Sequence, residues 1–308
     1  MEIPHIPVLF DEVIDSFDSV GDGYFVDCTL GYAGHSSGVL DRYRHLKHIG
    51  IDRDDEALEF SAKRLEPFGD RVKLYKGSFS KVLPTLQESP IVALLADFGV
   101  SSLQLDKKSR GFAFDSEVLD MRMDKDAPLS AYEVVNEYPS DRLEYILDNY
   151  GEVKGYKKIV SAIIKARAKE PIKSAKELSD IVVEASYKGG KIHPATLVFQ
   201  AIRIEVNDEL GEIERLLDVL ESSHFRGEVV SLITFHSLED RLVKNRFKRW
   251  SSDCICDSHA IRCECGKGHA LGKLVTRKPI VATPKEIKQN PRSRSAKLRV
   301  FRFTKSSR

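Results

Sequence analysis

The sequence predicts an α/β fold in which a largely parallel sheet is interrupted by an inserted all-helical domain. Short apolar segments alternate with helical segments over the first hundred residues, strand-like segments almost vanish from about 105 to 221, and they then return. Strands that alternate with helices favour right-handed crossovers and a parallel sheet. The chain has 308 residues, so we expect a discontinuous sheet domain, 1–104 and 222–308, and an inserted helical domain, 105–221.

The expected strands are short apolar segments, several of them closed by Asp, Cys or Gly. They are Tyr24–Cys28, Ile49–Asp52, Val72–Tyr75, Ile91–Ala96, Glu228–Phe235 and Leu298–Phe303. Two helices, Ser37–Arg44 and Asp54–Leu65, are expected between the early strands. In the expected insertion, apolar residues recur at helical spacing in three stretches, 140–151, 174–185 and 210–220, and the second begins with a Ser174–Glu177 capping box.

Charge and cysteine content limit the class of protein. Net charge is +1, but after Cys265 there are thirteen Lys or Arg and one acid, Glu286. Such a tail indicates either contact with a polyanion or a solvated terminus. We expect a cytoplasmic protein without a membrane span, because no N-terminal signal and no long apolar stretch is visible.

A glycine-containing loop after the first strand is the first candidate binding site. Gly31 and Gly34 allow a tight turn and close approach of a ligand, and Asp52 ends the next strand, where a carboxylate can accept ribose hydroxyls. Asp27 lies beside the loop, where its charge could face a sulfonium or an amine. The pattern is not G-x-G-x-x-G, which favours S-adenosylmethionine over a nicotinamide dinucleotide. Alternatively, Asp52 is a helix N-cap, a role that Asp54 could take instead.

Two later strand ends extend this candidate site. Phe79 follows the third strand, where an apolar ring would suit an adenine, although a core Phe is equally consistent with the pattern. Asp97 ends the fourth strand and is expected to face the ligand crevice at the carboxyl edge of the sheet. No helix signal follows Asp97 at once, which argues against a simple capping role.

Motifs along nearly the whole chain resemble those of one family. They are His5–Leu9, Asp27–Gly31, Gly34–Ser36, Asp97–Ser102, Gln104–Asp106, Arg110–Phe112, Leu119–Asp124, Asn149–Glu152, His193–Ala195, Phe199–Ile204, Val206–Leu210, Phe235–Arg241 and Asn290–Arg299. The sequence is similar to the bacterial 16S ribosomal RNA (cytosine-N4)-methyltransferase family (RsmH, formerly MraW). Each motif alone is weak evidence for the family. Chance does not explain why all of them occur here in the same order as in the family.

The resemblance implies a class I Rossmann-like methyltransferase with a helical substrate-recognition insertion. It implies methyl transfer from S-adenosylmethionine to the N4 amine of a cytidine in 16S rRNA, at the decoding centre of the small ribosomal subunit. The cofactor contacts it implies are Ala33, Gly34, His35, Asp52, Phe79, Asp97 and Gln104. The family usually has Gly where Ala33 stands, so a positive φ there would cost about 1 kcal/mol.

Methyl transfer to an exocyclic amine requires alignment and an acceptor for the amine protons. Asp97 is our first candidate, and His236 and Asn207 are further candidates for positioning substrate or relaying a proton. Alternatively, Ser237 and Asp240 form a capping box for the helix that follows. RNA phosphates would contact Arg292, Arg294, Lys297 and Arg299.

Four cysteines, Cys254, Cys256, Cys263 and Cys265, lie within twelve residues. Their spacing indicates either a structural zinc site or free thiols, since C-x-C is tighter than the usual C-x-x-C. The resemblance does not require this cluster.

Two other classes of protein compete with the methyltransferase, namely a nicotinamide oxidoreductase and a non-catalytic RNA-binding ribosome assembly factor. The expected partner is 16S rRNA or the small ribosomal subunit. The oligomeric state is open, a homodimer being one alternative.

Overall fold

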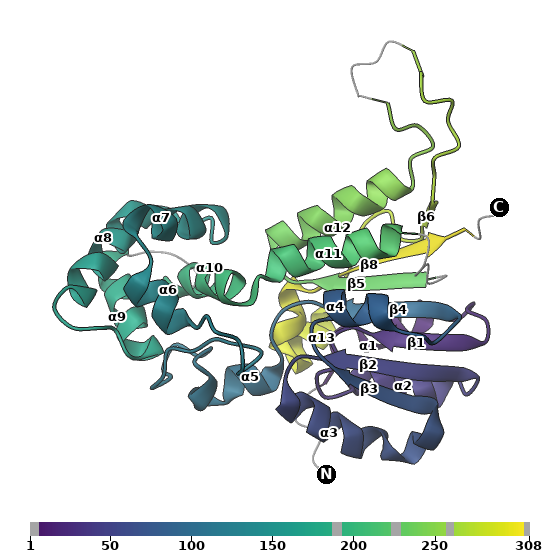
Figure 1. The fold of residues 1–308 in the computed structure, drawn as a ribbon, viewed down its shortest axis with the longest axis horizontal. Coiled ribbons are helices and arrows are strands. Elements are labelled where there is room, and N and C mark those ends of the chain that lie inside the picture. Colours follow the sequence, from purple (N-terminus) through teal and green to yellow (C-terminus); the bar gives the residue numbers. More distant parts are fainter. Residues whose placement is uncertain (1–5, 187–192, 223–228, 257–261, 305–308) are drawn as a thin grey trace. The chain divides into compact units, whose positions relative to one another are not determined.

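The computed structural model describes residues 6–186, 193–222, 229–256 and 262–304, which form two compact units (Figure 1). The sheet unit comprises Met1–Gly99 and Gly211–Arg308, and the helical unit comprises Val100–Leu210. The helical unit thus interrupts the sheet unit between its fourth and fifth strands. Its limits differ from those that the sequence suggested, 105 and 221.

The sheet has the strand order β3-β2-β1-β4-β5-β8-β6, and β7 also pairs with β8. The first five strands run parallel, whereas β8 runs antiparallel to β5. The order reverses between β1 and β4, which is where open α/β sheets bind ligands. The strands are β1 (Gly23–Asp27), β2 (Leu46–Asp52), β3 (Val72–Lys76), β4 (Ile91–Asp97), β5 (Val229–Thr234), β6 (Gly272–Leu274), β7 (Ile280–Val281) and β8 (Lys297–Phe303).

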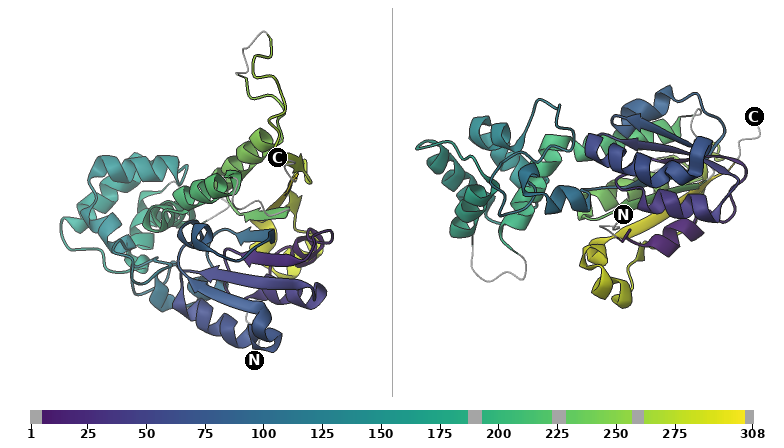
Figure 2. Two further views of the ribbon diagram at one scale, coloured as in Figure 1. Left: turned by 45° about the vertical axis from the view of Figure 1, so that its right-hand side comes forward. Right: turned by 90° about the horizontal axis from the view of Figure 1, so that it is seen from below.

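Helices cover both faces of the sheet (Figures 1 and 2). One face packs on α4 (Phe79–Val82), α11 (Glu209–Glu221) and α12 (Ser237–Trp250). The other packs on α1 (Phe10–Asp15) and α2 (Gly34–Arg42), while α13 (Pro284–Gln289) contributes Ile287 at its margin. Alternate residues of β4 serve the two cores, with Leu94 and Ala96 on one side and Ala93 and Leu95 on the other, as the period of a strand requires.

Helix α11 belongs to the sheet unit over most of its length, although the sequence analysis assigns it to the insertion. Its apolar stripe includes Ile213, Leu217 and Leu220, which are buried with residues of β4 and β5. The stripe therefore covers the sheet and makes α11 the crossover helix that leads into β5. Helical periodicity identifies such a buried face but not the partner that buries it.

The helical unit has a core of its own, which includes Val135, Leu147, Ile163, Leu178 and Ile202. Ser174 caps α9 as predicted and accepts a hydrogen bond from the Glu177 N–H at 3.1 Å. The Glu177 carboxylate bonds the N–H of Lys173 instead of the cap residue. The helices are α5 (Ser102–Asp106), α6 (Ala131–Glu137), α7 (Ser140–Asn149), α8 (Tyr156–Arg167), α9 (Ala175–Ala185) and α10 (Ala195–Asn207).

The remaining helix of the sheet unit is α3 (Asp55–Leu65), and it begins at a side-chain cap. Asp54 takes this capping role, accepting from the Glu56 N–H at 3.1 Å.

Short 3₁₀ turns are η1 (Glu66–Arg71), η2 (Leu83–Thr85), η3 (Lys108–Arg110) and η4 (Pro291–Ser295). Within the described ranges, no helix is both long enough and apolar enough to cross a lipid bilayer.

Candidate active site

Three acidic residues end three neighbouring parallel strands. Asp27 ends β1, Asp52 ends β2 and Asp97 ends β4, and β1 pairs with both of the other strands. The carboxyl ends of parallel strands meet at one edge, so the three acids lie together at the position where such sheets bind ligands. We call this the acidic edge.

Asp52 joins the glycine loop to the end of β2. Its Oδ2 accepts from the Gly31 N–H at 2.8 Å and its Oδ1 accepts from the Asp54 N–H at 2.9 Å. Burial raises the pKa of Asp52 above its usual value, and these two bonds oppose that shift. Because Asp54 caps α3, Asp52 is free of that role, and it fixes the backbone against which a ligand would lie.

Asp27 is turned into the protein. Its Oδ2 accepts from the Ser36 hydroxyl at 2.6 Å and its Oδ1 accepts from the Thr29 N–H at 3.1 Å. The Ser36 oxygen also lies 2.8 Å from His48 Nε2, and burial lowers the pKa of His48 to about 3, so the imidazole stays neutral and donates to Ser36. Burial likewise raises the pKa of Asp27 to about 6. These contacts show that Asp27 stabilises the glycine loop through Thr29 and Ser36. The sequence had suggested instead that its charge faces a sulfonium or an amine.

The residues of the glycine loop adopt an unusual backbone. Ala33 has φ +54° and precedes the first turn of α2, so the left-handed conformation considered from the sequence is present at a non-glycine residue. Gly31 also has a positive φ, +50°. His35 is buried, and its Nε2 lies 2.9 Å from the Val8 carbonyl oxygen, which ties α2 to the N-terminal segment.

Asp97 differs from the other two acids because its carboxyl group retains an unsatisfied oxygen. Its backbone N–H donates to Thr29 Oγ1 at 2.6 Å, but its Oδ1 is buried and has no hydrogen-bond partner among the residues that the structure describes. Burial, reinforced by the charges of Asp27 and Glu239, raises the pKa of Asp97 well above its usual value. A buried acceptor without a donor is costly unless a ligand supplies one.

Aromatic rings lie near this edge in two settings. Phe79 is buried at the start of α4, its ring centroid 6.2 Å from that of the buried Phe98. Phe235, directly after β5, is only partly buried and lies beside Gly99, where an added Cβ would stand 3.6 Å from its ring. Of these three residues, Phe235 is the one that is partly exposed.

His236 caps α12, whereas the sequence analysis named Ser237 and Asp240 as the capping pair. Its Nδ1 faces the Glu239 N–H at 3.5 Å, and the Glu239 carboxylate accepts from the N–H groups of Phe235 and His236 at 2.7 and 3.2 Å. His236 Nε2 also lies 3.0 Å from Glu239 Oε1. The fully buried Glu239 therefore holds the turn that carries both His236 and Phe235.

Two predicted site residues lie in the helical unit. Asn207 is buried; its Oδ1 accepts from the Met123 N–H at 2.8 Å, and its amide N–H₂ donates to the Met121 and Arg203 carbonyls at 2.8 and 3.0 Å. These bonds hold the 119–124 segment, so Asn207 has a structural task that the sequence did not reveal. Gln104 is also buried and accepts from the Ser101 N–H at 3.0 Å, and its contact with a cofactor stays a prediction.

The four basic residues proposed for RNA do not share one environment. Arg292 and Arg294 are exposed on η4, and Lys297 is partly exposed. Arg299 is buried, and its guanidinium bonds both Asp240 oxygens, at 2.7 and 3.2 Å. Arg299 was expected to contact RNA phosphates. Its guanidinium instead joins β8 to α12 through Asp240.

Three residues that the sequence did not indicate, Thr29, Ser36 and Glu239, orient the acids and the turn after β5. Glu239 could have been found, because it stands three residues after His236, the spacing of a capping box. Thr29 and Ser36 carry no such signal, because a single hydroxyl residue in a loop is common.

The acidic edge suits S-adenosylmethionine. The unsatisfied Asp97 oxygen needs a donor or a cation, and the ligand carries an ammonium and a sulfonium group. Asp52 and Gly31 form the adjoining loop without the bare backbone that a diphosphate requires. An open sheet in this strand order, with β8 antiparallel beside β5 and with this acidic edge, defines a class I S-adenosylmethionine-dependent methyltransferase.

Comparison with known proteins supports the assignment to the methyltransferases. The chain belongs to the MraW methylase family, whose model matches residues 2–304. It is 73% identical over 307 residues to the "Ribosomal RNA small subunit methyltransferase H" of Sulfurovum sp. (strain NBC37-1), covering 100% of each chain. It is 56% identical over 303 residues to the protein of that name from Aliarcobacter butzleri (strain RM4018), covering 98% of this chain and 100% of the other. The nicotinamide oxidoreductase alternative is not supported.

Proposed function

We propose that this protein transfers the methyl group of S-adenosylmethionine to the N4 amine of a cytidine in 16S rRNA, at the decoding centre of the small ribosomal subunit. The names of its relatives and the motifs in the sequence support the substrate. The observation that carries the chemistry is the buried Asp97 Oδ1 at the acidic edge, for which the described part of the chain supplies no hydrogen-bond partner. We further propose that the protein acts in the cytoplasm, where this substrate occurs.

Asp97 is the group that receives a proton in this proposal. S-adenosylmethionine supplies an electrophilic methyl group; its sulfur–carbon bond breaks as the nitrogen–carbon bond forms, and one amine proton must leave. The ionised Asp97 carboxylate accepts a hydrogen bond from the amine and then takes that proton. Burial supports the role, because it raises the pKa of Asp97 and so strengthens the carboxylate as a base.

Phe235 is the side chain that we propose to stack on the target base. The chain has Asp97-Phe98-Gly99-Val100 where many amine methyltransferases carry an aromatic motif, and Phe98 is buried. Phe235 is partly exposed on a turn that Glu239 holds at the end of β5. Stacking of a base on an aromatic ring contributes about 1–3 kcal/mol.

A methyl-transfer assay tests the proposed reaction. Small subunits or 16S rRNA from cells that lack this protein are incubated with the purified chain and labelled S-adenosylmethionine, and the nucleosides are identified by mass spectrometry. We expect N4-methylcytidine with the parent chain and none with Asp97→Ala. Asp70→Ala is the matched control, since Asp70 is exposed just before β3, at the amino end of a strand. Normal turnover by Asp97→Ala would refute its assignment.

The stacking role of Phe235 is tested in the same assay. We expect Phe235→Ala to lower kcat/KM by roughly 5- to 150-fold, the equivalent of one lost stacked base, and Phe235→Tyr to retain most activity. A loss in Phe235→Tyr equal to that in Phe235→Ala would contradict stacking.

A further inference from the structure

The connection between α12 and β6 carries four cysteines that the proposed reaction does not use. It extends from the sheet unit away from both elements (Figure 1). Of its described residues between Trp250 and Leu271, none belongs to a hydrophobic core, and Ile255 is 57% exposed. A segment that buries so little apolar surface needs another source of order.

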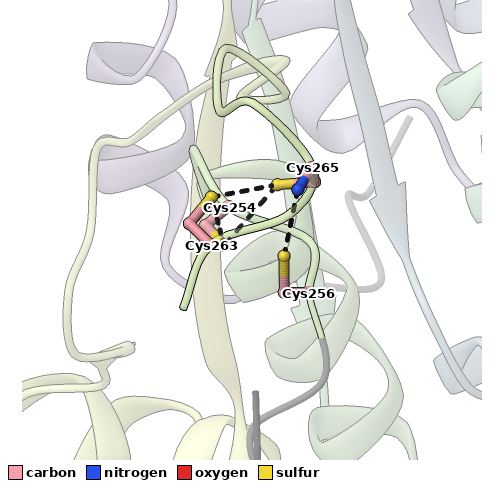
Figure 3. A group of neighbouring side chains, drawn as sticks. All are labelled: Cys254, Cys256, Cys263 and Cys265. Atoms are coloured by element: carbon pink, nitrogen blue, oxygen red, sulfur yellow. Dashed lines mark hydrogen bonds between the residues drawn. The ribbon is translucent and has the colours of Figure 1, made fainter. Parts of the chain in front are cut away.

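The four sulfur atoms converge. The Sγ atoms of Cys254, Cys263 and Cys265 lie 3.6 Å from one another in all three pairs, and the Sγ of Cys256 lies within 4.8 Å of each of them (Figure 3). Four thiolates around a zinc ion at about 2.3 Å would stand about 3.8 Å apart at the corners of a tetrahedron. Three of the six edges already have nearly this length.

Backbone hydrogen bonds support the same arrangement. The N–H groups of Glu264 and Cys265 donate to the Sγ of Cys256 at 3.2 and 3.3 Å. Donors aimed at a sulfur stabilise a thiolate, as they do around metal-bound thiolates. Left-handed residues follow at once, with φ +76° at Gly266, +63° at Lys267 and +78° at Gly268, and they turn the chain sharply after the fourth sulfur.

Hydrogen bonds join the two ends of the connection, between the cysteines and the elements α12 and β6. Asp253 receives the His269 N–H on its carbonyl at 3.1 Å and the Gly268 N–H on its carboxylate at 2.9 Å. The Leu271 N–H donates to the carbonyl of the buried Trp250 at 2.7 Å. These bonds bring Cys254 and Cys265 together.

We propose that Cys254, Cys256, Cys263 and Cys265 bind one structural Zn²⁺ ion that orders this loop. Four thiolates fill a tetrahedral shell and leave no position for substrate, so the role is structural. Binding displaces the thiol protons, and the resulting net charge of −2 is offset by the N–H donors and by the basic Arg262 and Lys267 beside the cysteines. The proposal is independent of the methyl transfer.

Metal analysis of the full chain, purified without a polyhistidine tag, tests the proposal. We expect about one zinc per chain by plasma mass spectrometry, and an X-ray absorption spectrum with a sulfur shell at about 2.3 Å. Cys263→Ser should lose the zinc. Cys28→Ala is the matched control, because Cys28 is buried in the core and should leave the zinc content unchanged.

Other outcomes would overturn it. They are a well-folded chain with no metal and four alkylatable thiols in the loop, a disulfide among these cysteines, or stoichiometric iron in place of zinc. If the serine variant fails to fold, the parent chain still decides the matter. Removal of its metal by a chelator should increase proteolysis within the loop, and added cobalt should give the absorption bands of a tetrahedral thiolate site.

Discussion

Asp97 and Asp27 show how one kind of residue serves two purposes at a single sheet edge. Asp27 has hydrogen-bond partners on both oxygens and braces the loop, whereas Asp97 Oδ1 has none among the described residues. Asp27 is buried and Asp97 is partly buried, and desolvation raises the pKa of each. The difference in partners, and not the residue type, identifies the acid that is available to a ligand.

The raised pKa of Asp97 predicts a pH dependence of cofactor binding. A bound sulfonium or ammonium group favours the ionised carboxylate, so binding releases a proton wherever Asp97 is protonated in the free protein. Affinity should therefore rise as the pH rises toward the raised pKa and become level above it. Isothermal titration calorimetry with S-adenosylmethionine across the neutral range measures this.

Asp97→Asn provides the comparison, since it removes the titrating group and preserves the shape of the side chain. The cofactor's own amino group titrates equally against both proteins, so the difference between them isolates Asp97. Parallel pH profiles for the parent and Asp97→Asn would exclude Asp97 as the coupled group.

At the scale of the elements, side chains that resemble catalytic residues instead join segments distant in the sequence. Asn207 connects the end of α10 to the 119–124 segment through two hydrogen bonds. Arg299 and Asp240 connect β8 to the first turn of α12. Both contacts form between residues that the linear sequence does not place together.

Asn207→Ala is expected to destabilise the helical unit by about 2–3 kcal/mol, because buried backbone groups lose their partners. Chemical denaturation measures the loss. If Asn207 is structural only, the fraction of the variant that remains folded should keep its kcat. A large fall in kcat without a fall in stability would restore the catalytic assignment.

Asp240→Ala should lower the free energy of unfolding by about 3 kcal/mol, because it leaves the buried Arg299 guanidinium without its carboxylate. Thermal denaturation of Asp240→Ala, Arg299→Ala and the double variant forms a cycle that isolates the pair. Additive losses would mean that the pair contributes nothing of its own.

The sequence predicts the regular elements well and the tertiary partners poorly. Strand positions follow from short apolar segments, and the caps at Asp54 and Ser174 follow from local spacing. By contrast, β6 and β7 have three and two residues, too few to show a period, and the core that buries α11 depends on the completed sheet. The acids of the site could be located by strand ends, but the unsatisfied state of Asp97 required coordinates.

For the whole molecule, the exposed part of the basic tail predicts a salt-dependent affinity for RNA. Arg292 and Arg294 are exposed, and each phosphate contact that is lost reduces the slope of log K against log salt by about 0.7 for single-stranded RNA. We expect Arg292→Ala and Arg294→Ala to lower both affinity and slope, as measured by filter binding at several salt concentrations.

Lys63→Ala, which removes an exposed charge from α3, is the matched control and should leave the slope unchanged. Equal slopes for the parent and both arginine variants would exclude this part of the tail from the interface.

The insertion between β4 and β5 also has a consequence during synthesis. The ribosome completes β4 long before it makes β5, and at about 5–20 residues per second the intervening residues 98–228 take on the order of 10 seconds. Throughout that interval the edge of β4 that will pair with β5 lacks its neighbour, whereas the contiguous helical unit receives every residue of its core before β5 is made. The nascent chain therefore offers an open strand edge to chaperones, and arrested chains that end before β5 should recruit more of them than chains that end after β8.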